Sequence, residues 1–216
     1  MEEPGPYPCA ASAADMLEAL LVWRRDVRHF LARPIPENEM ERLFALAQLA
    51  PSVGNAQPWR YLRVRSAFVR GALADHVDEA ARQAGQTYGT GDRAALYASL
   101  KLHGLREAPE ILAVFSDEAP AAGHGLGVAT MPEALRYSTV LAIHTLWLAA
   151  QSRGIGLGWV SILDPKSIAM MLDAPKHWHF MALLCVGYPE TPSDVPELER
   201  SDWQARQDWR VHVSER

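Results

Sequence analysis

The stretch Arg24-Arg-Asp-Val-Arg28 contains the densest group of residues able to do chemistry. Three guanidinium groups this close together can bind a phosphate or a carboxylate through paired hydrogen bonds. They can equally stay solvated and complement the dipole at the C-terminal end of a helix. Asp26 has two interpretations as well: an ion-pair member whose pKa the arginines lower, or a carboxylate held beside a ligand for proton transfer.

Two further polar groups are candidates for ligand binding. Residues 51–58 offer the hydroxyl of Ser52 and the amides of Asn55 and Gln57. These groups could hydrogen-bond the edge of a polar heterocycle, and a plain hydrophilic turn has the same composition. Ser161 interrupts an apolar stretch, so its hydroxyl either bonds to the local backbone or points at a ligand.

Spacing argues against other kinds of site. Gly154, Gly156 and Gly158 follow an expected helix and precede an expected strand, which is the reverse of the order in a dinucleotide-binding fingerprint. They indicate a helix stop and close packing of backbone instead. His177 and His179 have no third ligand nearby, so we expect no metal site. The chain also contains no Walker A sequence and no Gly-x-Ser-x-Gly elbow.

The composition is that of an average globular protein. The 216 residues are 49% apolar and 22% charged, which predicts a single domain over residues 1–216. A formal charge of -5 argues against a nucleic-acid partner. The most apolar segment, 137–150, is shorter than the roughly 20 residues of a membrane span. With two cysteines and no export signal, the sequence predicts a cytoplasmic protein without a membrane partner.

Hydrophobic periodicity predicts the elements that must position these groups. The helix over 133–153 is apolar on nearly every side, so we expect it at the centre of the fold or at a subunit interface. We expect other helices over 12–24, 40–50, 67–84, 93–105 and 166–172, strands over 59–64, 111–115, 159–163 and 180–186, a flexible start over 1–11, a flexible connector over 85–91, a surface excursion over 119–132 and an extended arm over 189–216.

Four motifs in this order and spacing resemble the flavin-dependent nitroreductase superfamily. They are Arg24-Arg-Asp-Val-Arg28, Ala50-Pro-Ser-Val-Gly-Asn-Ala-Gln-Pro-Trp59, Gly158-Trp-Val-Ser161 and Cys185-Val-Gly-Tyr-Pro189. Within that superfamily, the chain is most similar to the 5,6-dimethylbenzimidazole synthases. That similarity lies in Asp26, Lys101-Leu-His-Gly-Leu-Arg-Glu-Ala-Pro109, Thr130-Met-Pro-Glu133, and Pro196-Glu-Leu-Glu199 followed by Trp203. The resemblance covers about residues 15–205, and His103 departs from the acidic or amide residue expected at its position.

The resemblance implies an α+β fold of three layers, in which helices flank a central mixed sheet. It further implies a homodimer that exchanges its C-terminal arms and binds FMN at the subunit interface. Arg24, Arg25 and Arg28 would hold the phosphate and ribityl chain, while Ser52 and Gln57 would face the flavin. The other positions implied to contact FMN are Asp26, Val27, Leu100, Lys101, Leu102, Gly158, Ser161 and, as a further phosphate ligand, Arg206.

The resemblance also implies a reaction in which reduced FMN is the substrate. Molecular oxygen would drive its fragmentation to 5,6-dimethylbenzimidazole, the lower ligand of vitamin B12, and erythrose 4-phosphate. Asp26 would act as a base toward the ribityl chain, and Ser161 would hydrogen-bond the flavin or its oxygen adduct. A separate flavin reductase is a candidate partner. The alternatives are an NAD(P)H-dependent FMN reductase of nitro or quinone compounds, and a flavin-binding protein without chemistry.

Overall fold

A computed structural model describes residues 12–216, so the start expected to be flexible, 1–11, lies outside the described residues. Four strands form one sheet in the order β1 (Trp59–Arg63), β2 (Glu110–Asp117), β4 (Trp178–Gly187) and β3 (Gly156–Val160). All three pairings are antiparallel. The mixed character expected of the sheet is therefore limited to one isolated parallel bridge, between Asp26 and Leu157 at the β3 edge.

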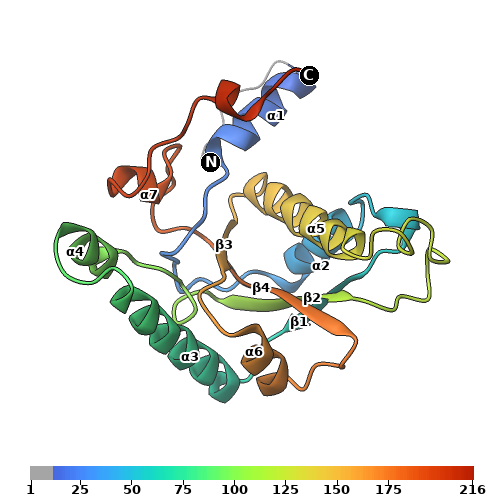
Figure 1. The fold of residues 1–216 in the computed structure, drawn as a ribbon, viewed down its shortest axis with the longest axis horizontal. Helices are drawn as coiled ribbons and strands as arrows, with labels where there is room; N and C mark the ends of the chain where they lie inside the picture. Colours follow the sequence, from blue (N-terminus) through green and yellow to red (C-terminus); the bar gives the residue numbers. More distant parts are fainter. Residues whose placement is uncertain (1–11) are drawn as a thin grey trace.

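Helices cover both faces of this sheet and give the three layers expected (Figure 1). One face carries α2 (Glu37–Ala47) and α5 (Ala134–Gln151), and the other carries α3 (Ala67–Gln86) and α6 (Pro165–Met171). Alternate residues of a strand point to opposite faces, so β2 contributes to two separate apolar clusters. Leu112 and Val114 pack with α2 and α5, whereas Ile111, Ala113 and Phe115 pack with α3 and α6.

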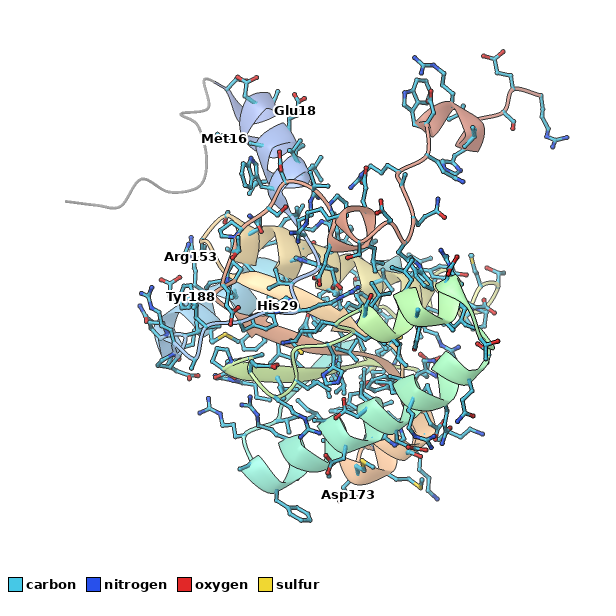
Figure 2. All side chains as sticks on the ribbon, turned by 90° about the vertical axis from the view of Figure 1, so that its left-hand side faces the viewer. Met16, Glu18, His29, Arg153, Asp173 and Tyr188 are labelled. Carbon is cyan, nitrogen blue, oxygen red and sulfur yellow. The ribbon has the colours of Figure 1, made fainter. Side chains whose placement is uncertain are left out.

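The remaining elements lie outside these layers. They are α1 (Ala13–Trp23), η1 (Val53–Asn55), α4 (Asp92–Ser99), α7 (Glu197–Arg200) and η2 (Trp209–His212). None of the residues in α1 is buried, and α1 and the C-terminal segment project from the body of the molecule (Figure 2). Between residues 12 and 216, no helix has the length and apolar character needed to cross a membrane.

Two predicted element boundaries are wrong for identifiable reasons. The helix expected over 93–105 ends at Ser99, because the chain then runs extended beside residues 28–30. Arg28 Nη1 donates to the Lys101 carbonyl at 2.9 Å, and a side chain on Gly104 would meet the Phe30 ring. The strand expected over 159–163 instead spans Gly156–Val160, so Ser161 lies just beyond it.

Gly156 and Gly158 in β3 pack closely against Val27, and Gly158 meets its backbone, as expected. A Cβ on Gly156 would lie 2.7 Å from Val27 Cγ2, and one on Gly158 would collide with the Val27 carbonyl oxygen. Gly154, which follows α5, has a φ of 68° that a side chain would strain. The segment around Val27 can therefore lie directly on β3.

We predict that Gly158→Ala destabilises the protein by ~1–3 kcal/mol, because the added methyl group overpacks a contact with backbone. The matched control is Gly71→Ala in α3, where a Cβ would meet nothing within 4 Å. This control should gain ~0.5–1 kcal/mol from helix propensity. Urea unfolding of both variants measures the two free energies, and equal effects would contradict the close packing at Gly158.

Candidate active site

Residues 24–28 form the floor of the candidate site because they lie along the edge strand β3. The Val27 N–H donates to the Leu157 carbonyl at 3.1 Å, next to the bridge between Asp26 and Leu157. The Asp26 side chain then reaches the next free backbone donor of the strand: its Oδ1 accepts from the Trp159 N–H at 2.8 Å. Sheet geometry thus fixes the position of this carboxylate.

The other carboxylate oxygen of Asp26 faces a guanidinium group. Arg28 Nε lies 3.0 Å from Asp26 Oδ2, and the Arg28 side chain is only 11% exposed. Arg28 also donates to the Lys101 carbonyl, which ties the segment expected to line the ligand, 100–102, to the site. Leu100, Lys101 and Leu102 in addition line a second cleft of about 670 Å³ between α3 and α4.

The pKa of Asp26 is raised above its usual range, and burial is the main cause. The Trp159 N–H and the Arg28 guanidinium both favour the charged carboxylate, and Glu197 of the C-terminal segment disfavours it. Burial outweighs the two favourable contacts. Asp26 is therefore an ion-pair member, as one interpretation expected, but its pKa is raised by burial rather than lowered by the arginines. Its role in proton transfer to or from a ligand stays a prediction.

Arg24, Arg25 and Arg206 form a cationic cluster beside Asp26. Burial lowers the pKa of Arg24, and repulsion from Arg206 lowers it further. The pKa of Arg25 is lowered by burial and then by repulsion from Arg24 and Arg206. Mutual repulsion between the exposed Arg206 and the partly buried Arg24 and Arg25 favours the binding of an anion between them.

The cluster is held in place by contacts that the sequence did not indicate. The guanidinium of Arg24 lies 4.9 Å from the centre of the Trp147 ring, and Trp147 Nε1 donates to the Arg25 carbonyl at 3.1 Å. Arg25 Nε donates to the Asp194 carbonyl at 2.8 Å and so joins the C-terminal segment to residues 24–28. An indole N–H inside an apolar helix needs a partner, which is the one signal that could have identified Trp147.

A cleft of about 480 Å³ lies between residues 25–29 and the C-terminal segment. Arg25, Asp26 and Arg28 line one side, and Glu197 and Arg200 are among the residues of the other side. His29, labelled in Figure 2, also lines the cleft, and its Nε2 lies 3.5 Å from Glu197 Oε1. The volume of the cleft is that of a small-molecule site, and its lining offers both cationic and acidic side chains to a ligand.

The loop that carries Ser52 and Gln57 is held by hydrogen bonds within the loop and to α5, and it lies away from Asp26. Ser52 Oγ accepts from the Gln57 N–H at 3.0 Å, and the Val53 N–H donates to Ser138 Oγ at 3.0 Å. Ser138 is nine residues before Trp147 on α5, a separation of about 13 Å along a helix. Within one chain, Ser52 and Gln57 are therefore not brought to Asp26.

Ser161 lies two residues after Trp159, about 7 Å further along an extended chain. It is exposed, and its hydroxyl has no hydrogen-bond partner between residues 12 and 216. Behind the site, Cys185 pairs with Gly158 across β3 and β4, and burial raises the pKa of its thiol to about 12. Cys185 is thus an uncharged packing residue, whereas the Ser161 hydroxyl is available to a ligand.

Comparison with known proteins identifies the family. Residues 21–188 match the sequence model of the nitroreductase family. The chain belongs to the nitroreductase family. It is 55% identical to the 5,6-dimethylbenzimidazole synthase of Rhodospirillum rubrum over 90% of this chain and 92% of that one. It is 52% identical to the enzyme of the same name from Rhodobacter capsulatus, over 88% and 91% of the two chains.

Solved structures agree with this assignment of the nitroreductase fold. A crystal structure of oxidized iodotyrosine deiodinase bound to FMN and 3-iodo-L-tyrosine superposes with a TM-score of 0.68 and 26% identity. It covers 82% of this chain and 91% of its own. An NADPH:FMN oxidoreductase from Vibrio harveyi superposes with a TM-score of 0.66 over 93% and 76% of the two chains, at 18% identity.

The raised pKa of Asp26 predicts how it contributes to stability. Above the ordinary aspartate pKa, the unfolded chain has released this proton while the folded chain still holds it, so stability falls as pH rises through the raised pKa. We expect the unfolding free energy of the native protein, minus that of Asp26→Asn, to decrease as pH rises from the ordinary aspartate pKa to the raised one. Urea titrations of both proteins at a series of pH values measure this difference.

The matched control for this measurement is Asp164→Asn. Hydrogen bonds from Ser167 lower the pKa of the Asp164 carboxyl, so the stability that Asp164 contributes is lost as pH falls. The difference in unfolding free energy between the native protein and Asp164→Asn should therefore increase with pH. Slopes of the same sign for the two aspartates would contradict the assigned burial of Asp26.

Proposed function

We propose that this nitroreductase-family protein is a 5,6-dimethylbenzimidazole synthase. It fragments reduced FMN with molecular oxygen to 5,6-dimethylbenzimidazole and erythrose 4-phosphate, and so supplies the lower ligand of vitamin B12. Three relatives of 48–55% identity bear the name of this enzyme. The observation that carries the proposal is Asp26, a carboxylate with a raised pKa in a cleft that Arg25 and Arg28 also line.

The residues present fit FMN. Arg24, Arg25 and Arg206 repel one another in the absence of an anion, and the phosphate of FMN supplies that anion. The ribityl chain then extends along the cleft past Asp26 and Arg28. Val27 and Gly158 contribute backbone to the floor, and residues 100–102 line the flavin. Reduced FMN brings the electrons that molecular oxygen accepts.

Asp26 is the base of the reaction. Its carboxylate accepts a proton from the ribityl chain, and its raised pKa increases the driving force for this transfer at neutral pH. Arg28 holds the carboxylate in position, since its Nε bonds the oxygen that the Trp159 N–H leaves free. Ser161 donates its unpaired hydroxyl to the flavin during oxidation and directs the outcome toward ring cleavage.

The active enzyme is a homodimer with FMN at the interface. Large apolar residues are exposed on two helices: Met16, Leu17, Leu21 and Val22 on α1, and Tyr137, Val140 and Leu141 on α5. A monomer rarely exposes so much apolar surface on adjoining elements. The dimer brings Ser52 and Gln57 of one subunit to the flavin of the other, and the arms of residues 189–216 are exchanged. A flavin reductase in the cytoplasm supplies reduced FMN.

The decisive test is single-turnover oxidation. The purified protein is mixed with anaerobically reduced FMN, oxygen is admitted, and 5,6-dimethylbenzimidazole is measured by mass spectrometry. We expect product from the native protein and a loss of ~10²–10⁴-fold in its rate of formation in Asp26→Asn, since an amide cannot accept the proton.

Recovery of all the flavin intact would overturn the proposal. Steady-state NADPH oxidation with a nitro compound would then identify an ordinary reductase. Tight binding of reduced flavin, with neither reaction and with no effect of Asp26→Asn, would identify a flavin-binding protein without chemistry.

A second prediction concerns the phosphate. Arg206→Gln should weaken FMN binding about tenfold, the value of one charge-assisted hydrogen bond, and leave riboflavin binding unchanged. Quenching of flavin fluorescence gives both dissociation constants. The control is Arg210→Gln on the same segment, because Arg210 already pairs with Asp208 at 2.8 Å. An equal loss for FMN and riboflavin would contradict the assignment of Arg206 to the phosphate.

A further inference from the structure

The loop that carries Ser161 is four residues long and joins β3 to α6. It contains a tight turn in which the Leu163 N–H donates to the Ser161 carbonyl at 3.1 Å. Its last residue, Asp164, caps α6 by accepting from the Ser167 N–H at 2.9 Å. These contacts shape the loop and its junction with α6, but none of them attaches the loop to the layer of α3.

That attachment comes from a histidine on α3. His76 Nε2 accepts from the Asp164 backbone N–H at 3.0 Å, across 88 positions of sequence. Within residues 12–216, His76 is the one side chain from another element that hydrogen-bonds the backbone of loop 161–164. An imidazole nitrogen that accepts must carry a lone pair, so this bond uses the unprotonated Nε2 of His76.

The two ends of the Ser161 segment are therefore held from opposite sides. Before Ser161, the Trp159 N–H is bonded to Asp26 at 2.8 Å; after it, the Asp164 N–H is bonded to His76 at 3.0 Å. Ser161 is exposed and its own hydroxyl has no partner in the described chain, so it depends on these anchors for its position. A loop with one anchor would leave the hydroxyl free to move relative to the Asp26 carboxylate.

We propose that His76 is a positioning residue that holds the Ser161 hydroxyl in register with Asp26 through its bond to the Asp164 backbone. The inference rests on the proposed function, in which Ser161 directs the oxidation of flavin toward cleavage. His76 does not line the cleft of about 480 Å³ beside Asp26. Its loss should therefore change the fraction of oxidised flavin that is cleaved and leave the affinity for FMN unchanged.

The test compares two substitutions at one position. His76→Leu keeps apolar bulk but has no acceptor, whereas His76→Gln places an amide oxygen near the former Nε2. A displacement of a catalytic group by about 1 Å can lower a reaction rate ~100-fold. We therefore expect His76→Leu to lower the yield of 5,6-dimethylbenzimidazole per reduced FMN oxidised about tenfold. His76→Gln should keep this yield within about threefold of the native value. The dissociation constant for oxidised FMN should be the same in both.

The matched control is Gln83→Leu. Gln83 lies two turns further along α3 and, together with His76, lines a cleft of about 650 Å³. Its side chain bonds Glu79 at 2.6 Å rather than the loop. It should leave the product yield unchanged. A native yield in His76→Leu, or a glutamine variant as defective as the leucine variant, overturns the role of His76 while the proposed function stands.

Hydrogen exchange of the FMN-loaded protein separates this inference from the proposed function. Loss of one hydrogen bond should speed exchange of the amides in residues 161–164 about fivefold in His76→Leu and much less in His76→Gln. If the native protein returns its flavin intact, the proposed function fails and the exchange rates still test the anchor. Unchanged exchange in His76→Leu overturns the inference in either case.

Discussion

The close approach of the Val27 backbone to the edge strand β3 is the contact on which the site depends. Gly156 and Gly158 leave the room for it, and the bond from the Val27 N–H to the Leu157 carbonyl sets its register. This register brings Asp26 to a free N–H of the strand two residues further on. A shift by one residue would turn the carboxylate to the opposite side, because side chains alternate along extended backbone.

The electrostatics of the site follow from how the arginines are engaged. Arg25 donates to the backbone carbonyls of Val22 and Asp194, and Arg24 lies over the Trp147 ring. These two guanidinium groups lie near the Asp26 carboxylate but form no ion pair with it. Among the described residues, only Arg28 forms an ion pair with Asp26. The contacts that lower the pKa of Asp26, including its ion pair with Arg28, are weaker than the effect of burial, which raises it. Asp26 therefore holds its proton more strongly than a surface aspartate.

The sequence predicted the layers well and the contacts of the site only in part. Apolar periodicity identified α2 and α5, because Met40, Leu43 and Ile143 face one core. The end of α4 at Ser99 was missed, since the bond from Arg28 to the Lys101 carbonyl is a tertiary contact with no local pattern. For the same reason the sequence left two interpretations of Asp26: its pKa depends mainly on burial, which the spacing of residues does not predict.

The Ser52 loop and the arginine cluster contact opposite ends of α5, which gives a geometric argument for a twofold assembly. The Ser52 loop is bonded to Ser138 near the start of α5, whereas Arg24 lies on Trp147 near its end. Val140 and Leu141 are exposed between them. A twofold axis through this apolar face would set the helix antiparallel to its copy and place the start of one beside the end of the other. Burial of the apolar surface and completion of the flavin site would then be the same event, and the stability of the dimer would rise with the occupancy of the site.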